Sequence, residues 1–275
     1  METKRVRVIG AGLAGSEAAL QLASFGFDVD LYEMRPEKPT PAHRGGALAQ
    51  LVCSNSFKGL ALTSAHGLLK NELNMLGSFL LKAAERTAVP AGESLTVNRD
   101  LFSEEVERLI LACPNITLHR EEVKTLEGEF PTIVAAGPLA SDTLADDIFK
   151  RLGSERLHFF DAIAPVVETE SIDFEHAFYK NRWEKGETED FINCPLDKET
   201  YDLFVQKLRE AESIEPRPFE KHELFEGCLP IEEMARRGTE TLRYGPMRPV
   251  GLGINPTGKK WHAVIQLRAE NAQKT

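Results

Sequence analysis

Apolar residues follow two patterns along the chain: short continuous or alternating runs, which predict strands, and runs spaced three to four apart, which predict helices. The first forty residues contain both: a strand pattern at 5–9, an alanine- and leucine-rich helix pattern up to Gly26, and a second strand pattern at 27–33. The same reading predicts strands at 95–97, 116–122, 132–138, 158–169 and 263–267, and helical segments at 60–86, 101–112, 141–152 and 197–211. Strands that alternate with helices predict an α/β fold with a parallel sheet.

A glycine-rich turn separates the first strand from the first helix. It consists of Gly10, Ala11, Gly12, Leu13, Ala14 and Gly15. In this G-x-G-x-x-G spacing the first glycine allows the tight turn, the second lets a pyrophosphate approach the backbone, and the third lets helix and strand pack closely. The helix that follows directs free N–H groups and its positive dipole end at the phosphates.

The second strand ends in an acidic residue, Glu33, whose carboxylate can accept hydrogen bonds from an adenosine ribose. Strand, glycine turn, helix, strand and acid in this order indicate an adenine-dinucleotide site, in preference to a purely structural glycine turn. The run 132–138 contains Gly137 and predicts another short, buried parallel strand whose carboxyl end meets the cofactor.

The regular alternation of predicted strands and helices ends at about residue 153. We therefore predict two domains, a Rossmann-like α/β domain at 1–153 and an α+β domain at 154–275. No apolar run reaches the roughly 20 residues of a membrane helix, and no signal-peptide pattern is present, so we expect a cytoplasmic protein without a membrane partner. The histidines form no metal-binding motif and the cysteines no C-x-x-C pair, so we expect no metal.

A basic segment runs from Met234 to Arg268 in a chain whose net charge is −10. It holds seven Lys or Arg residues against a single acid, Glu240, and it also contains Tyr244 and Trp261. Loops of this kind can contact phosphates and stack on bases. Composition alone slightly favours the other interpretation, a solvated surface paired with acids elsewhere in the chain.

The four cysteines differ in their surroundings. Cys113 ends an apolar helix and fits a small buried hydrophobic residue, whereas Cys194 precedes a proline and is undecided. Cys228 lies in a Gly-Cys-Leu-Pro turn just before the basic segment, where cationic neighbours would favour a reactive thiolate. Cys53 is flanked by polar residues and would lie near a bound flavin if its loop returns over the pocket.

Several segments together resemble the family of folate- and FAD-dependent tRNA uracil-5 methyltransferases (TrmFO), which is related to the GidA flavoproteins. The most specific is the block from Phe225 to Gly238, FEGCLPIEEMARRG, which continues as LRYGPMRPVGL from Leu242 to Leu252. The others are VIGAGLAGSEAA at 8–19, LVCSNSF at 51–57, AAGPL at 135–139 and DAIAP at 161–165. The resemblance covers essentially the whole chain.

The resemblance implies that methylenetetrahydrofolate supplies a one-carbon unit, FAD supplies electrons and NAD(P)H reduces the flavin, so that the T-loop uridine of tRNA becomes 5-methyluridine. By their match to family motifs, Cys228 would attack uracil C6 and Cys53 would be a second catalytic thiol beside the flavin. The glycine turn, Glu33 and Gly137 would hold FAD. The residues expected to contact tRNA phosphates or the folate tail are Arg236, Arg237, Arg243 and Arg248.

Members of that family continue well past the point where this sequence stops, so we expect a C-terminally truncated chain with an incomplete FAD domain. Two other functions remain open. One is a GidA-like or generic FAD/NAD oxidoreductase, and the other is an inactive fragment that only binds nucleotide or RNA. Flavin binding and salt-sensitive tRNA affinity distinguish the three.

Overall fold

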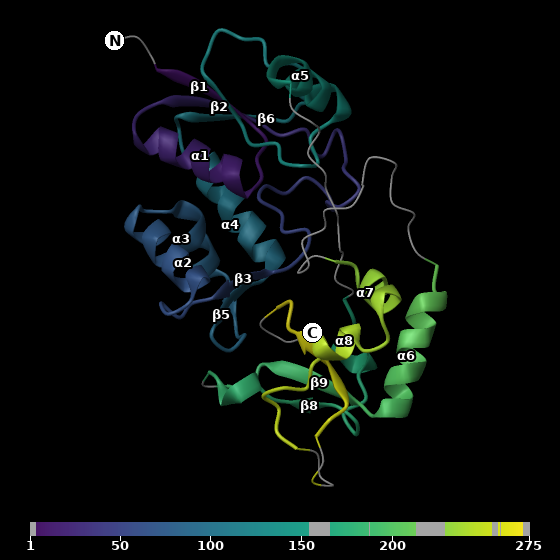
Figure 1. The fold of residues 1–275 in the computed structure, drawn as a ribbon. Coiled ribbons are helices and arrows are strands. Elements are labelled where there is room, and N and C mark those ends of the chain that lie inside the picture. The colour runs from purple at the N-terminus through teal and green to yellow at the C-terminus, as the bar shows by residue number, and fades with distance from the viewer. Residues whose placement is uncertain are drawn as a thin grey trace. The chain divides into compact units, whose positions relative to one another are not determined.

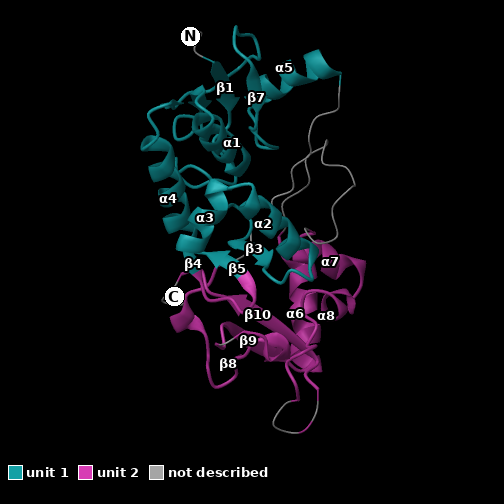
Figure 2. Ribbon diagram, turned by 90° about the vertical axis from the view of Figure 1, so that its left-hand side faces the viewer, with its two compact units in different colours: residues 1–88, 95–163 teal, residues 89–94, 164–275 magenta. Residues whose placement is uncertain are grey.

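The computed structural model of the chain describes residues 4–153, 166–186, 188–212, 229–254, 258 and 260–271. The chain divides into two compact units, Met1–Ala88 with Leu95–Ile163, and Val89–Ser94 with Ala164–Thr275 (Figure 2). The sequence predicts residues 1–153 as one domain, whereas the structure groups the segment 89–94 with the second unit. The division of labour between a flavin domain and a tRNA domain stays a prediction.

Unit 1 contains a parallel sheet whose strands, among the described residues, lie in the order β6-β2-β1-β7. The strands are β1 (Arg5–Ile9), β2 (Asp28–Tyr32), β6 (Ile116–His119) and β7 (Thr132–Val134). Helix α1 (Leu13–Ser24) connects β1 to β2, which pair in register from Arg5 opposite Asp28 to Ile9 opposite Tyr32 (Figure 1). The predicted α/β class with a parallel sheet is confirmed.

The order of these strands creates a switch point. The chain proceeds from β1 outward to β2 and β6, then returns to place β7 on the opposite side of β1. In open parallel sheets, ligands bind outside the carboxyl ends of the strands where the order reverses. The ends of β1 and β7 are therefore the expected position of a ligand site.

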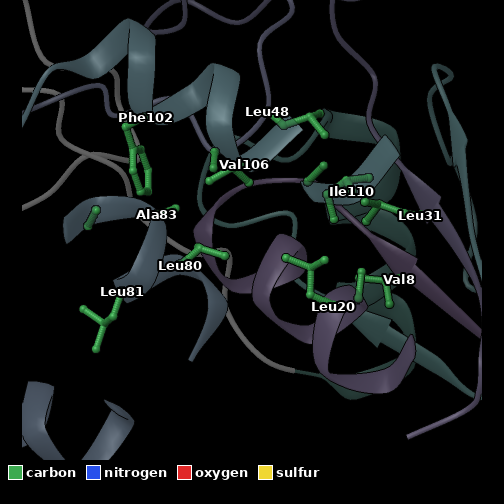
Figure 3. Close-up of a cluster of buried hydrophobic side chains, with 14 of the residues drawn as sticks. Val8, Leu20, Leu31, Leu48, Leu80, Leu81, Ala83, Phe102, Val106 and Ile110 are labelled. Carbon is green, nitrogen blue, oxygen red and sulfur yellow. The ribbon is translucent and has the colours of Figure 1, made fainter. Parts of the chain in front are cut away.

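Three helices cover one hydrophobic core of unit 1. Leu20 of α1, Leu80 of α3 (Phe79–Arg86) and Ile110 of α4 (Arg99–Leu111) belong with Val8 and Leu31 of the sheet to one buried cluster (Figure 3). Burial of each such side chain contributes about 1.5–3 kcal/mol. This core fixes α1, and with it the glycine turn, against the sheet.

The leucine-rich segment 60–86 resolves into two helices, α2 (Ala65–Met75) and α3, separated by Gly77 at φ +81°. Each helix begins at a serine, Ser64 or Ser78, whose side chain accepts a hydrogen bond from the first turn. Leu68 and Leu69 are 49% and 55% exposed, so the leucine spacing does not mark one buried face. Short strands β3 (Ser56–Gly59), β4 (Ala88–Val89) and β5 (Ser94–Val97) form a sheet of order β3-β5-β4.

Strand β7 corrects one prediction. The run 132–138 predicts a buried strand, but Ile133 and Val134 are 39% and 42% exposed. The reason is topological, because β7 pairs with β1 on one side and is the last strand of the described sheet. Helix α5 (Asp142–Leu152) follows it and ends at Gly153, which has φ +66°.

Unit 2 contains an antiparallel sheet of order β10-β9-β8 in its described part. Its elements are β8 (Phe178–Tyr179), β9 (Phe191–Leu196), β10 (Ala263–Arg268), α6 (Lys198–Glu210), α7 (Ile231–Arg237), α8 (Thr241–Tyr244) and 3₁₀ turns at Thr169–Ser171 and Arg182–Glu184. Tyr201 of α6 is fully buried, donates its hydroxyl proton to the Thr239 carbonyl (2.6 Å) and accepts the Arg243 N–H (3.0 Å). This tyrosine fastens α6 to the segment before α8.

The hydrophobic pattern does not predict strand β9, because Pro195 interrupts the run of apolar residues. Pro195 lies beyond the residues that pair with β8, where its missing N–H leaves no ladder bond unmade on that side. The predicted strand at 158–169 is described only from residue 166, and no strand forms there. None of the described helices is long and apolar enough to cross a membrane.

Candidate functional site

The glycine turn lies at the switch point of the parallel sheet. Gly10 has φ +97°, and its N–H donates to the Tyr32 carbonyl at the end of β2 (2.8 Å). A Cβ atom on Gly10 would lie 2.6 Å from the Ala136 Cα, in the segment that follows β7. A Cβ on Gly15 would lie 1.7 Å from the Gly10 carbonyl oxygen. Both positions therefore require glycine for packing within the protein.

Gly12 has different surroundings. A Cβ atom placed there would meet no heavy atom of the described chain within 4 Å. Gly12 is the N-cap of α1 and provides no side-chain cap, and the first turn of the helix holds no acid. The first N–H groups of a helix lack intrahelical partners and attract anions. The open space at Gly12 thus lies next to donors that suit a pyrophosphate.

Glu33 follows β2 and is only 6% exposed. Its carboxylate accepts the Ala11 N–H (3.2 Å), the Arg35 N–H (3.1 Å) and the Arg35 Nε–H (2.9 Å). Burial would raise the pKa of Glu33, but the Arg35 guanidinium and the two backbone donors outweigh it, and the pKa is lowered. A carboxylate offers about four acceptor positions, so one position remains for a ribose hydroxyl.

Arg35 is a site residue that the sequence reasoning missed. Its side chain is 3% exposed and pairs with Glu33, while its Nη1 lies 3.4 Å from the Gln50 side-chain oxygen. Arg120 of the segment after β6 donates to the carbonyl oxygens of Arg35 and Gly46. The only signal in the sequence was the presence of a second charge two residues after Glu33.

The loop after β2 returns to the glycine turn. The Ala49 N–H donates to the Ala11 carbonyl (2.9 Å), and Leu48 and Ala49 are fully buried in the core of unit 1. Cys53 follows four residues later and is exposed. Four residues span at most about 14 Å, so Cys53 lies within that distance of Ala49, and its carbonyl oxygen lies 3.4 Å from Arg99 Nη2.

Gly137 follows β7 at φ +64°, and an added Cβ would meet no described atom within 4 Å. Its neighbours Ala135 and Ala136 contact the glycine turn, and the Ala135 N–H donates to the Ile9 carbonyl (2.7 Å). The structure therefore brings together residues 10–15, Glu33 and residues 135–137 at one edge of the sheet. The open space, the helix N-terminus and the buried carboxylate fit the diphosphate and ribose of an adenine dinucleotide.

The four arginines proposed for tRNA contact are not equivalent. Arg236 and Arg237 occupy the last turn of α7 and are exposed, as is Arg248. Arg243 is half-buried and donates to the Glu240 carboxylate (2.7 Å) and the His262 carbonyl (3.0 Å). Arg243 therefore has a structural role, and the exposed three are the better candidates for an external ligand.

The remaining three cysteines differ in position and burial. Cys228, the predicted nucleophile, lies outside the described residues. Cys194 on β9 is half-buried, and burial raises the pKa of its thiol, which disfavours the thiolate. Cys113 follows the C-cap of α4 and is half-buried, so it is less buried than the predicted small core residue.

The family described as "Glucose inhibited division protein A" matches residues 5–275. Several curated relatives carry the name "Methylenetetrahydrofolate--tRNA-(uracil-5-)-methyltransferase TrmFO". That of Aquifex aeolicus is 53% identical over 99% of this chain and 61% of the relative, and that of Sulfurihydrogenibium sp. is 51% identical over 98% and 62%. That of Lactobacillus helveticus is 50% identical over 98% of this chain and 66% of the relative. The chain thus spans less than two thirds of the length of these relatives.

Solved structures resemble the chain only weakly. The structure of Aquifex aeolicus GidA is 20% identical and gives a TM-score of 0.37 over 47% of this chain and 24% of that chain. A TM-score at this level does not establish a shared overall fold.

Proposed function

We propose a function from the premise that the chain belongs to the glucose inhibited division protein A family, whose match covers residues 5–275. The proposed activity is methylation of the T-loop uridine of tRNA at C5, giving 5-methyluridine. Methylenetetrahydrofolate is the proposed one-carbon donor, FAD the bound flavin and NAD(P)H the reductant. The observation that carries the proposal is the 50–53% identity to proteins of that named activity over 97–99% of this chain.

The geometry of unit 1 supports the flavin part of the proposal. The N–H groups at the start of α1 would bind the pyrophosphate across the open space at Gly12, and Glu33 would accept a ribose hydroxyl. When bound, the flavin would accept hydride from NAD(P)H and supply the electrons that reduce the one-carbon unit. The close packing at Gly10 and Gly15 fixes the start of α1, and with it the N–H groups that would bind the pyrophosphate.

A thiol has a defined task in this chemistry. Uracil C5 is a poor nucleophile until a group adds at C6, because only then do the ring electrons form an enolate. In the proposal the Cys228 thiolate bonds to C6, and C5 bonds to the one-carbon unit as one of its two bonds to folate nitrogen opens. C5 then loses its proton and the second carbon–nitrogen bond breaks, which releases tetrahydrofolate and leaves a methylene group on C5. Hydride, which the reduced flavin would supply, converts this methylene to a methyl group, and the thiolate leaves C6. Cys53, which is exposed and follows the loop that contacts the glycine turn at Ala49, is the proposed second thiol.

The test is methyl transfer to a T-loop uridine by the purified protein, after its flavin absorbance has been measured. We expect Cys228→Ala to lower the rate at least about a hundredfold, because nucleophilic activation is lost. Cys113→Ala is the matched control and should keep the rate within about twofold, because Cys113 lies after the C-cap of α4 and has no role in the proposed reaction. Full activity of Cys228→Ala would disprove the role of this thiol.

The alternatives predict other results. A GidA-like or generic flavin oxidoreductase would bind flavin without methylating the T-loop uridine. An inactive nucleotide-binding fragment would purify colourless and would not take up added FAD. The proposed function requires both the flavin and a tRNA affinity that falls steeply with salt.

A further inference from the structure

The 3₁₀ turn Arg182–Glu184 in unit 2 holds a tryptophan in an unusual conformation. Trp183 has φ +61° and ψ +19°, and Glu184 follows with φ +54°. A left-handed backbone is rare for a bulky residue and costs free energy that the surroundings must supply. The indole is nevertheless 64% exposed. Burial of the ring therefore does not explain why the chain holds it there.

The indole packs against the backbone of Gly251, which forms its seat. The Trp183 N–H donates to the Gly251 carbonyl (2.8 Å). A Cβ atom on Gly251, which has φ +86°, would lie 2.9 Å from the indole Cε2 and 3.0 Å from its Cδ2. The ring lies against the bare backbone of Gly251, and most of its surface stays open to solvent.

Hydrogen bonds fasten the turn to the sheet of unit 2. Arg182 donates from Nη1 to the carbonyl oxygens of Arg248 and Val250, and from Nε to the Gln266 side-chain oxygen (3.2 Å). Gln266 in turn donates to Asn193, a fully buried residue of β9 (3.0 Å). The seat is thus rigid before any ligand arrives, which lowers the entropic cost of binding.

Cationic residues lie in and next to the turn that carries the indole. The exposed Arg248 lies close enough to Arg182 that, after burial, its charge is the second cause that lowers the pKa of Arg182. Lys180 and Lys185 flank the turn and pair with Glu184 (3.6 Å) and Glu93 (2.8 Å). An aromatic face beside cationic side chains is the combination that binds unpaired nucleotides, through base stacking and phosphate contact.

We propose that Trp183, seated on Gly251, is a stacking platform for an unpaired base of RNA, and that Arg248 contacts a neighbouring phosphate. The inference rests on the proposed function, because it assigns part of the tRNA contact to unit 2. The alternative occupant is the pterin ring of a folate. Small ligands bind in concave pockets that bury about 70–90% of their surface, whereas this indole is 64% exposed. An open face suits one nucleotide of a polymer that is held at several points.

The first test uses the fluorescence of Trp183. The chain has two tryptophans, Trp183 and Trp261. Trp261 stacks on Phe178 at 5.7 Å, and its Nε1 has no acceptor among the described residues, so Trp261→Phe removes no known hydrogen bond. In that variant we expect tRNA and an oligouridylate to quench the remaining tryptophan. Binding of tRNA without quenching would overturn the proposal, as would quenching by methylenetetrahydrofolate alone.

The second test compares RNA affinities of substituted proteins. We expect Trp183→Ala to weaken tRNA binding about 5- to 100-fold and Trp183→Phe, which keeps a stacking ring, to recover most of it. Trp183→Gly should lose the same affinity without a lower melting temperature, because glycine accepts the left-handed backbone. Phe25 is an aromatic residue of unit 1 that is 76% exposed, more than Trp183. Phe25→Ala is therefore the control and should bind as the unsubstituted protein does.

The outcomes separate the two proposals. Unchanged tRNA affinity in both Trp183→Ala and Trp183→Gly would overturn the platform and leave the methyltransferase proposal intact. Weakened binding with intact melting behaviour, together with normal flavin content, would support the platform specifically. If the unsubstituted protein binds no tRNA at any salt concentration, both the platform and the tRNA part of the proposed function fail.

Discussion

The carboxylate of Glu33 has a structural role in the protein in addition to its proposed role in ribose binding. It neutralises Arg35, whose guanidinium is almost fully buried, and it accepts the Ala11 N–H in the glycine turn. Removal of one partner from a buried ion pair costs about 3–5 kcal/mol, since the other charge is left uncompensated. Substitution of Glu33 would therefore unfold the site as well as weaken ribose binding, and Gly12 is the better position for testing the ligand.

Substitution by alanine should affect mainly ligand affinity at Gly12 and mainly protein stability at Gly15. Gly12→Ala points a methyl group into open space, so we expect the free energy of unfolding to change by less than about 1 kcal/mol. The same methyl group obstructs the pyrophosphate, and FAD affinity should fall at least about tenfold. Gly15→Ala meets the Gly10 carbonyl and should destabilise the protein by about 3 kcal/mol. Urea unfolding and flavin titration measure the two effects.

Wild-type FAD affinity in Gly12→Ala would contradict the assignment of the pyrophosphate to this turn. A Gly15→Ala protein as stable as the original would contradict the tight packing of α1 on β1.

At the scale of elements, α3 and α4 are joined by a charge cluster. Glu105 of α4 accepts hydrogen bonds from Arg108 (2.7 Å) and from Arg86 at the end of α3 (2.7 Å). These two guanidinium groups lower the pKa of Glu105 to about 2 from its ordinary 4.5. The carboxylate is 15% exposed, but the arginines are 57% and 60% exposed, so salt screens part of the interaction.

This shift predicts an acid-sensitive contribution to stability. A carboxyl with a depressed pKa in the folded state stabilises the protein above about pH 4.5, and the stabilisation disappears as the pH falls toward about 2. Glu105→Gln should therefore be less stable than the original protein at pH 6, and the difference should close between pH 4.5 and 2. Urea unfolding across this range is the measurement. Glu104→Gln, on the exposed side of α4, controls for the change in net charge.

A difference between the Glu105→Gln and original proteins that does not change over this pH range would contradict the cluster. The cluster itself could not be predicted from local spacing alone. Arg108 lies three residues after Glu105 on one helix, an arrangement visible in the sequence, but Arg86 arrives from α3.

At the scale of the whole molecule, charge is distributed unevenly. The net charge is −10, so any affinity for tRNA depends on local basic groups and not on the average field. Arg248 is exposed, and its carbonyl oxygen accepts a hydrogen bond from Arg182, the residue before Trp183. Arg243 instead donates its hydrogen bonds to Glu240 and His262. The two arginines should therefore respond differently to the same substitution.

We expect Arg248→Ala to weaken tRNA binding and to reduce the slope of log affinity against log salt by about 0.7–0.9, because one phosphate contact is lost. Arg243→Ala should instead lower the melting temperature. Filter binding between 50 and 200 mM salt, with thermal unfolding of the same proteins, tests both. An unchanged slope for Arg248→Ala would exclude a phosphate contact at that position.

The sequence by itself determined the unit from Arg5 to Glu33, because its signals are local. Apolar periodicity defines β1, α1 and β2, and the spacing of three glycines defines the turn between them. Local periodicity also located α4, α5, α6 and β10 to within a few residues. It did not show that Leu68 and Leu69 are exposed, because regular spacing indicates a helix face but not whether another element covers it.

Only the tertiary structure decided the properties that depend on residues far apart in the chain. These are the edge position of β7, the grouping of the segment 89–94 with unit 2, and the packing of Trp183 against Gly251. The pairing of Glu33 with Arg35 belongs with them, since only burial turns two nearby charges into a necessary pair. Sequence spacing encodes backbone conformation over a few residues, whereas burial and exposure depend on which distant segments pack together.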